Sequence, residues 1–139
     1  MCRVKCRLVK SDPCVEPYLY VLDKRVFRDA LIRFRMGITE LFVHNHRYSA
    51  APFTNICPLC MENVEDEIHF LLHCPATFDL RMRYLLPIAQ IETGDPLSSI
   101  FFNDDICAIR NTATYLFKAF QRRSEALSLM NSYEELFED

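Results

Sequence analysis

Residues 56–75 read ICPLCMENVEDEIHFLLHCP and are the segment of the chain most informative about its fold. Its spacing is C-x2-C-x8-H-x4-C. Two cysteines separated by two residues form a tight turn that aims both thiolates at one point, and a second pair of ligands completes the tetrahedron that zinc prefers. We therefore expect a zinc knuckle over residues 56–75, with one structural zinc ion bound by Cys57, Cys60, His69 and Cys74.

The fourth ligand has an alternative, because His73 lies four residues after His69 and would share its face of a helix. We favour Cys74. Pro75 disfavours helical geometry at the residue before it, so this thiolate can turn back toward His69. A Cys2His2 finger also needs a longer gap of about twelve residues between its ligand pairs. Four protein ligands leave no position for water, so such a site supports structure and does not hydrolyse a substrate.

The remaining cysteines do not extend this pattern. The chain has seven cysteines in 139 residues, and an odd count in a small protein does not indicate a disulfide framework. Cys2, Cys6 and Cys14 have no partner at metal-like spacing, and we expect Cys107 to lie in a helix core. The competing interpretation of Cys57 and Cys60, as two small buried apolar residues, does not explain four candidate ligands within eighteen residues.

The rest of the chain predicts helices. It contains only two glycines, whereas β folds use glycine freely in turns, and no glycine-rich phosphate loop can be written in it. Apolar spacing predicts one helix from Asp23 to an interruption at Gly37, a second from Ile38 toward Tyr48, and a third from Thr77 to Pro87. The fold class is therefore mainly α, a compact helical domain with one zinc knuckle.

The longest predicted helix follows Asp104 and Asp105, either of which offers an N-cap. The sequence Phe102-Asn103-Asp104-Asp105 imitates a polymerase active-site motif, but a cap fits this position before a long amphipathic helix better. We expect one face of this helix to be apolar and four basic residues to lie off it. The apolar positions are Ile106, Ile109, Ala113, Leu116, Phe117 and Phe120, and the basic ones are Arg110, Lys118, Arg122 and Arg123.

The domain organisation follows from these patterns. We expect a flexible lead-in over residues 1–17, a single helical zinc-binding domain over 18–123, and an acidic C-terminal tail over 124–139 with frayed last residues. The N-terminus has no apolar segment typical of a secretory signal, and the longest uncharged stretch has 14 residues, too few for a membrane span. We expect a soluble, intracellular protein that does not bind membranes.

Charge is distributed unevenly along the chain. Residues 1–60 carry ten Lys/Arg against five Asp/Glu, whereas residues 61–139 carry six against fourteen. A basic half can attract nucleic acid, and an acidic half can bind a basic protein partner.

The order of the motifs in this chain resembles the order found in a known protein family. Cys57-Pro58-Leu59-Cys60, the acidic residues 65–67, and the run from Ile68 to Pro75 followed by Leu80-Arg81 are similar to the zinc-binding module of LINE-type, non-LTR retrotransposon reverse transcriptases. The segment from Ala30 to Gly37, with Arg47-Tyr48, is similar to the helical lead-in of that module. The resemblance covers roughly residues 18–123. It implies the same four zinc ligands and a role near RNA or DNA.

Catalysis is not carried over, because the polymerase, RNase H and nuclease domains of that family are absent from these 139 residues. We predict a non-catalytic nucleic-acid-binding module, not an enzyme. Its phosphate contacts would come from basic residues of the first half, which are otherwise a solvated helix face. These residues are Lys24, Arg28, Arg33, Arg35 and Arg47. The alternative is a structural or protein-interaction domain in which zinc only stabilises the fold.

Overall fold

The computed structural model describes residues 21–45, 55–89, 100–101 and 105–137. Among these residues the fold is mainly α, as predicted, and the β structure is one isolated antiparallel bridge between Ile56 and Val64. The predicted lead-in over residues 1–17 lies outside the described residues. The elements are, in chain order, α3 (Arg25–Met36), α4 (Phe42–Asn45), the π-helix η1 (His69–His73), the 3-10 helix η2 (Pro75–Thr77), α5 (Phe78–Leu80), the π-helix η3 (Arg81–Leu85), α6 (Leu86–Ala89) and α8 (Ile106–Phe137).

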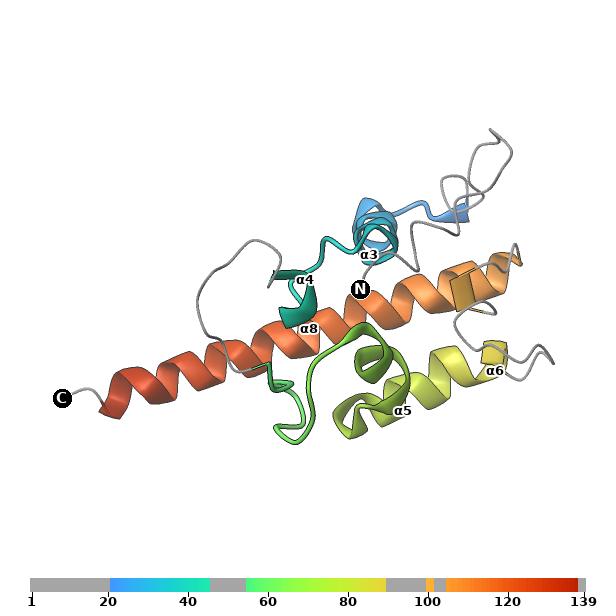
Figure 1. Cartoon of the computed structure of the whole chain (residues 1–139). Helices are drawn as coiled ribbons and strands as arrows, with labels where there is room; N and C mark the ends of the chain where they lie inside the picture. Colours follow the sequence, from blue (N-terminus) through green and yellow to red (C-terminus); the bar gives the residue numbers. More distant parts are fainter. Residues whose placement is uncertain (1–20, 46–54, 90–99, 102–104, 138–139) are drawn as a thin grey trace.

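Helix α8 is the central element of the fold. α3 crosses it on one side, and the run of α5, η3 and α6 lies along it on the other (Figure 1). The core lies between these layers. Phe34 of α3 is fully buried, and its ring centroid is 6.1 Å from that of Phe70 and 6.3 Å from that of Phe120. Aromatic residues far apart in the sequence therefore hold the layers together.

Two predicted helix boundaries are confirmed. α3 ends at Gly37, which has φ 68° and whose N–H bonds the carbonyl of Phe34, while the Ile38 N–H bonds that of Arg33. This pair of bonds is a Schellman ending, and the left-handed conformation explains why glycine stands there. At the start of α8, the Asp105 carboxylate accepts the Ala108 N–H at 3.0 Å, as expected of an N-cap.

Two other predicted helices have different limits. The helix expected from Ile38 is reduced within the described residues to α4, because the Thr39 hydroxyl accepts the Leu41 N–H and the Thr39 N–H bonds the His44 ring. Side chains thus take the place of helical hydrogen bonds. Pro87 does not end the third helical run, which reaches Ala89. The wide π turn of η3 precedes Pro87, at the point where its missing N–H would break an α-helical ladder.

The structure of helix α8 differs from three further expectations. Residues 124–137, predicted as an acidic tail, continue the helix to Phe137. Cys107 and Ile106, predicted in the core, are exposed at the first turn. Arg123, predicted off the apolar face, is fully buried. It lies three and four residues after Phe120 and Ala119 and so belongs to the core face by its spacing.

Candidate metal centre

The first two cysteines lie on a tight turn at the end of a short two-stranded stem. The stem is closed by hydrogen bonds from the Cys57 N–H to the Asn63 carbonyl at 2.8 Å and from the Glu65 N–H to the Asn55 carbonyl at 2.7 Å. The Met61 N–H bonds the Cys57 carbonyl at 2.9 Å, and Met61 itself adopts φ 59°. This left-handed residue reverses the chain after Cys60 and lets both thiols face the same side.

The other two residues come from opposite ends of η1. The Asp66 carboxylate accepts the His69 N–H at 2.6 Å and orients the first turn. At the far end the Cys74 N–H bonds the His69 carbonyl at 2.7 Å, and Cys74 has the extended backbone expected before Pro75. Residues five apart diverge on an α-helix, but the wider π turn brings them to one side. The π geometry therefore aligns His69 with Cys74.

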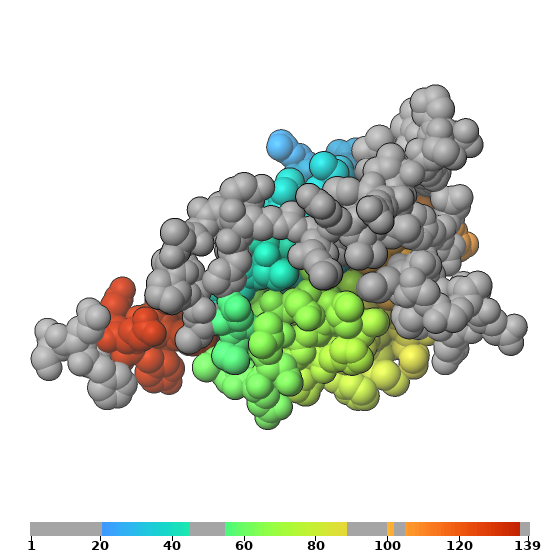
Figure 2. Space-filling view, viewed as in Figure 1, coloured from blue at the N-terminus to red at the C-terminus, as the bar shows by residue number. Residues whose placement is uncertain are grey.

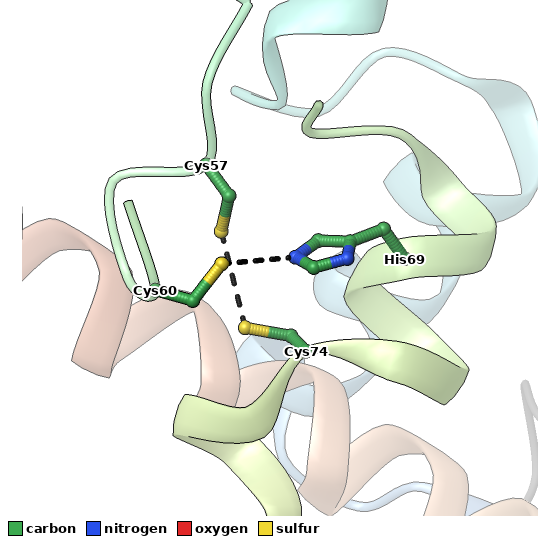
Figure 3. Close-up of side chains that lie close together, drawn as sticks. All are labelled: Cys57, Cys60, His69 and Cys74. Atoms are coloured by element: carbon green, nitrogen blue, oxygen red, sulfur yellow. Dashed lines mark hydrogen bonds between the residues drawn. The ribbon is translucent and has the colours of Figure 1, made fainter. Parts of the chain in front are cut away.

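The four predicted side chains converge (Figure 3). The Cys60 sulfur is 3.4 Å from His69 Nε2, the Cys57 and Cys74 sulfurs are 3.9 Å apart, and all four donor atoms lie within 4.8 Å of one another. A zinc tetrahedron with Zn–S bonds of about 2.3 Å and Zn–N bonds of about 2.05 Å has S–S edges of about 3.8 Å and S–N edges of about 3.6 Å. The cluster is therefore compatible with a bound metal ion.

The cluster is secluded from solvent. Cys57 and Cys74 are 0% exposed and His69 is 6% exposed, while Cys60 is partly exposed. The described cysteines are free thiols, and 3.9 Å is far beyond the length of about 2.05 Å of a disulfide bond. His73, the alternative ligand, is exposed and does not belong to the cluster.

The two buried thiols differ in acidity. The hydrogen bond from Cys57 lowers the pKa of Cys74 to about 7, whereas that same bond, together with burial, raises the pKa of Cys57 above its usual range. Backbone N–H groups of Leu59 and Cys60 point at the Cys57 sulfur, and that of Ala76 points at the Cys74 sulfur. Such donors favour the thiolate, the form that binds metal.

Helix α8 holds the η1 side of the cluster in place. The Tyr115 hydroxyl donates to the Phe70 carbonyl at 2.6 Å, and Arg122 donates to the Ala76 carbonyl at 2.8 Å. Arg81, which follows η1 in the chain and does not belong to α8, donates to the carbonyls of Leu71 and Cys74 at 3.0 and 2.6 Å. These donors bind carbonyls of η1, of Cys74 and of η2, and so fix the segment that carries His69 and Cys74.

A buried ion pair holds the stem side. Glu65 forms two hydrogen bonds with Arg123, at 2.7 and 2.9 Å, and also accepts the Phe42 N–H at 2.9 Å. Nearby, the buried His44 bonds Glu67 through Nε2 at 2.6 Å. Because the Thr39 N–H occupies Nδ1, we assign His44 as the neutral Nε2–H tautomer. The stem is thereby joined to both α4 and α8.

The sequence patterns did not predict the supporting role of these residues. In the sequence, Glu65 and Glu67 are only part of an acidic run. The one available signal was the position of Arg123 on the core face of its helix. A buried arginine needs an acidic partner, and nothing in the local sequence says which carboxylate, 58 residues away, supplies it.

The described basic residues predicted to contact nucleic acid lie on two different flanks of α3. Lys24, Arg28 and Arg35 recur at spacings that put them on one flank of the helix. Arg33 lies on the other flank, where it lines a groove with Val26 and Phe117. Arg47 lies outside the described residues.

Comparisons with protein-family models, with curated proteins and with solved structures find no match for this chain. Among the described helices, none combines the length and the apolar character that crossing a membrane requires.

Proposed function

We propose that Cys57, Cys60, His69 and Cys74 bind one structural zinc ion. The convergence of three thiols and an imidazole, at separations close to the edges of a zinc tetrahedron, supports this assignment. Thiolate and imidazole donors disfavour magnesium and calcium, which prefer oxygen. Four protein ligands would complete the coordination, so the metal would act by holding the knuckle against α8.

We further propose that the domain is a non-catalytic nucleic-acid-binding module derived from a LINE-type retrotransposon reverse transcriptase. The motif resemblance supports the class, and the flank of α3 that carries Lys24, Arg28 and Arg35 offers cations at helical spacing to a phosphate backbone. The metal would stabilise this surface indirectly, through the knuckle stem. Glu65 of the stem accepts the Phe42 N–H, and Phe42 lies six residues after the end of α3.

Nucleic-acid binding can be tested by fluorescence anisotropy of the zinc-loaded protein with single-stranded RNA, single-stranded DNA and duplex DNA in rising salt. We expect log K to fall linearly with log salt, with a slope near −0.7 per phosphate contact on single strands. Lys24→Gln combined with Arg28→Gln should make the slope shallower by about 1.4. Arg25→Gln is the control, because Arg25 is already paired with Asp29 at 3.3 Å.

The proposal fails if the zinc-loaded protein binds none of the three polymers at low salt. The second candidate is then a protein-interaction domain whose acidic C-terminal half binds a basic partner. The observation that favours it is the last part of α8, where exposed Leu129 and Tyr133 are accompanied by Glu134 and Glu135.

A further inference from the structure

The basic residues in the acidic second half of the chain are confined to one part of it. All six Lys/Arg residues of the segment 61–139 fall between Arg81 and Arg123. Three of them have defined partners within the protein: Arg81 bonds backbone carbonyls, Arg122 bonds Asp79, and Arg123 bonds Glu65. The other three are Arg83, Arg110 and Lys118, and all three are exposed.

Two of these cations meet at one aromatic ring. Arg83 Cζ lies 5.4 Å and Lys118 Nζ lies 5.5 Å from the ring centroid of the half-buried Tyr84. Arg83 and Tyr84 belong to η3, whereas Lys118 comes from α8. Within the described part of the chain, neither cation forms an ion pair with a carboxylate. Among the described residues, two positive charges therefore meet at one ring without an ion-pair partner for either.

We propose that Arg83, Tyr84 and Lys118 form a second phosphate-contacting site, which takes neighbouring phosphates of a single-stranded nucleic acid. This inference rests on the proposed nucleic-acid function and adds a contact surface outside α3. An arginine offers a planar fork to phosphate oxygens and a lysine offers a point charge, so the pair fits adjacent phosphates of one strand. An anion bound there also relieves the repulsion between the two cations.

The tyrosine ring positions the two cations. Cation–π contact restricts both long side chains before any ligand arrives, which lowers the entropy lost on binding. The acidic end of α8 does not neutralise this site. Elements α5, η3 and α6 lie along the first half of α8, and the last part of the helix extends away from them (Figure 1).

The test compares two double variants with the same change in charge. Arg83→Gln with Lys118→Gln removes the site, whereas Arg25→Gln with Arg110→Gln removes two exposed arginines away from the ring. We expect anisotropy titrations of single-stranded RNA to show about tenfold weaker binding and a salt slope shallower by about 1.4 for the first variant only. Equal losses for both variants would overturn the inference. Absence of binding by the unaltered protein would instead overturn the proposed function, and this inference with it.

Tyr84→Leu tests the positioning role separately, because it keeps both charges and removes the ring. We expect weaker binding than in the unaltered protein, by a factor of about 3, with the salt slope largely retained. Thermal melting of the zinc-loaded variant shows whether it is folded. A folded Tyr84→Leu protein that binds RNA as tightly as the unaltered protein would overturn the role of the ring.

Discussion

Met61 is the residue that carries the conformational cost of the knuckle. Its φ of 59° is in the left-handed region, where a side chain with a Cβ costs about 1–2 kcal/mol. The turn needs this conformation because the Met61 N–H must reach the Cys57 carbonyl while Cys60 faces the cluster. Its side chain is exposed, so packing does not require methionine there.

The Met61 series has a predicted order of stability. Met61→Gly should leave the zinc-loaded protein as stable or up to about 1 kcal/mol more stable, because the relief of strain exceeds the extra freedom of the unfolded chain. Met61→Val should cost about 1–2 kcal/mol, because a β-branched side chain fits this region worst. Urea unfolding of the three proteins measures the order. A valine variant as stable as the glycine variant would contradict the strained turn.

Among the elements, two consecutive arginines of α8 join it to the segment that carries the Cys/His cluster in different ways. Arg123 and Glu65 form a pair that is almost completely buried, whereas Arg122 and Asp79 form an exposed pair at 2.7 Å. The hydrogen bond from Arg122 lowers the pKa of Asp79 to about 2, but solvent screens this pair. Only the buried pair connects the knuckle stem to the core face of the helix.

The two arginines should therefore differ in their contribution to stability. Arg123→Met should cost about 3–5 kcal/mol, because it leaves the Glu65 carboxylate buried without its partner. Arg122→Met removes an exposed pair and one carbonyl bond, and should cost about 1–2 kcal/mol. Adding Glu65→Gln to Arg123→Met should restore part of the loss, since the uncompensated charge disappears. Chemical denaturation of the zinc-loaded variants gives these values, and equal costs for the two arginines would contradict the assignment.

The elements that follow local rules could be predicted from the sequence. The end of α3 at Gly37, the cap at Asp105 and the convergence of the four knuckle residues each depend on a few neighbouring residues. The π turns, the position of Pro87 inside a helical run, and the partner of Arg123 depend on contacts between distant segments. These contacts leave no local signature, apart from the spacing that puts Arg123 on a core face.

In the whole molecule, α8 extends beyond the elements that pack against it. Its final part projects beyond the knuckle segment (Figures 1 and 2). Leu129, Tyr133 and Leu136 are 62%, 63% and 72% exposed there, and they recur at spacings of four and three. The core thus lies along the first two-thirds of the helix.

This arrangement predicts a contrast between leucines of one helix. Leu116→Ala should cost about 2–5 kcal/mol, because Leu116 is fully buried. Leu129→Gln and Leu136→Gln should each change the stability by no more than about 0.5 kcal/mol, because little apolar area leaves the core. Thermal melts of the zinc-loaded variants compare them. A loss at Leu129 that matched the loss at Leu116 would contradict the exposed position of this part of the helix.

The proposed zinc ion would link the knuckle to the rest of the molecule, because the knuckle has little apolar core of its own and would be held by its four ligands and by α8. Binding energy at such a site is folding energy. Removal of zinc should therefore loosen the stem, release Glu65 from Arg123, and reduce the cooperativity of unfolding. Acidification should have the same effect, since thiolates must lose their metal as they take up protons.

Native mass spectrometry, before and after chelation, shows whether Cys57, Cys60, His69 and Cys74 bind zinc. We expect one zinc ion per chain in the unaltered protein and in His73→Ala, and none in Cys57→Ser, His69→Ala or Cys74→Ser. The metal-free forms should also lose a cooperative thermal transition. A purified protein that contains no metal and melts cooperatively would rule out a structural zinc site at these four residues, as would zinc that survives Cys74→Ser but is lost in His73→Ala.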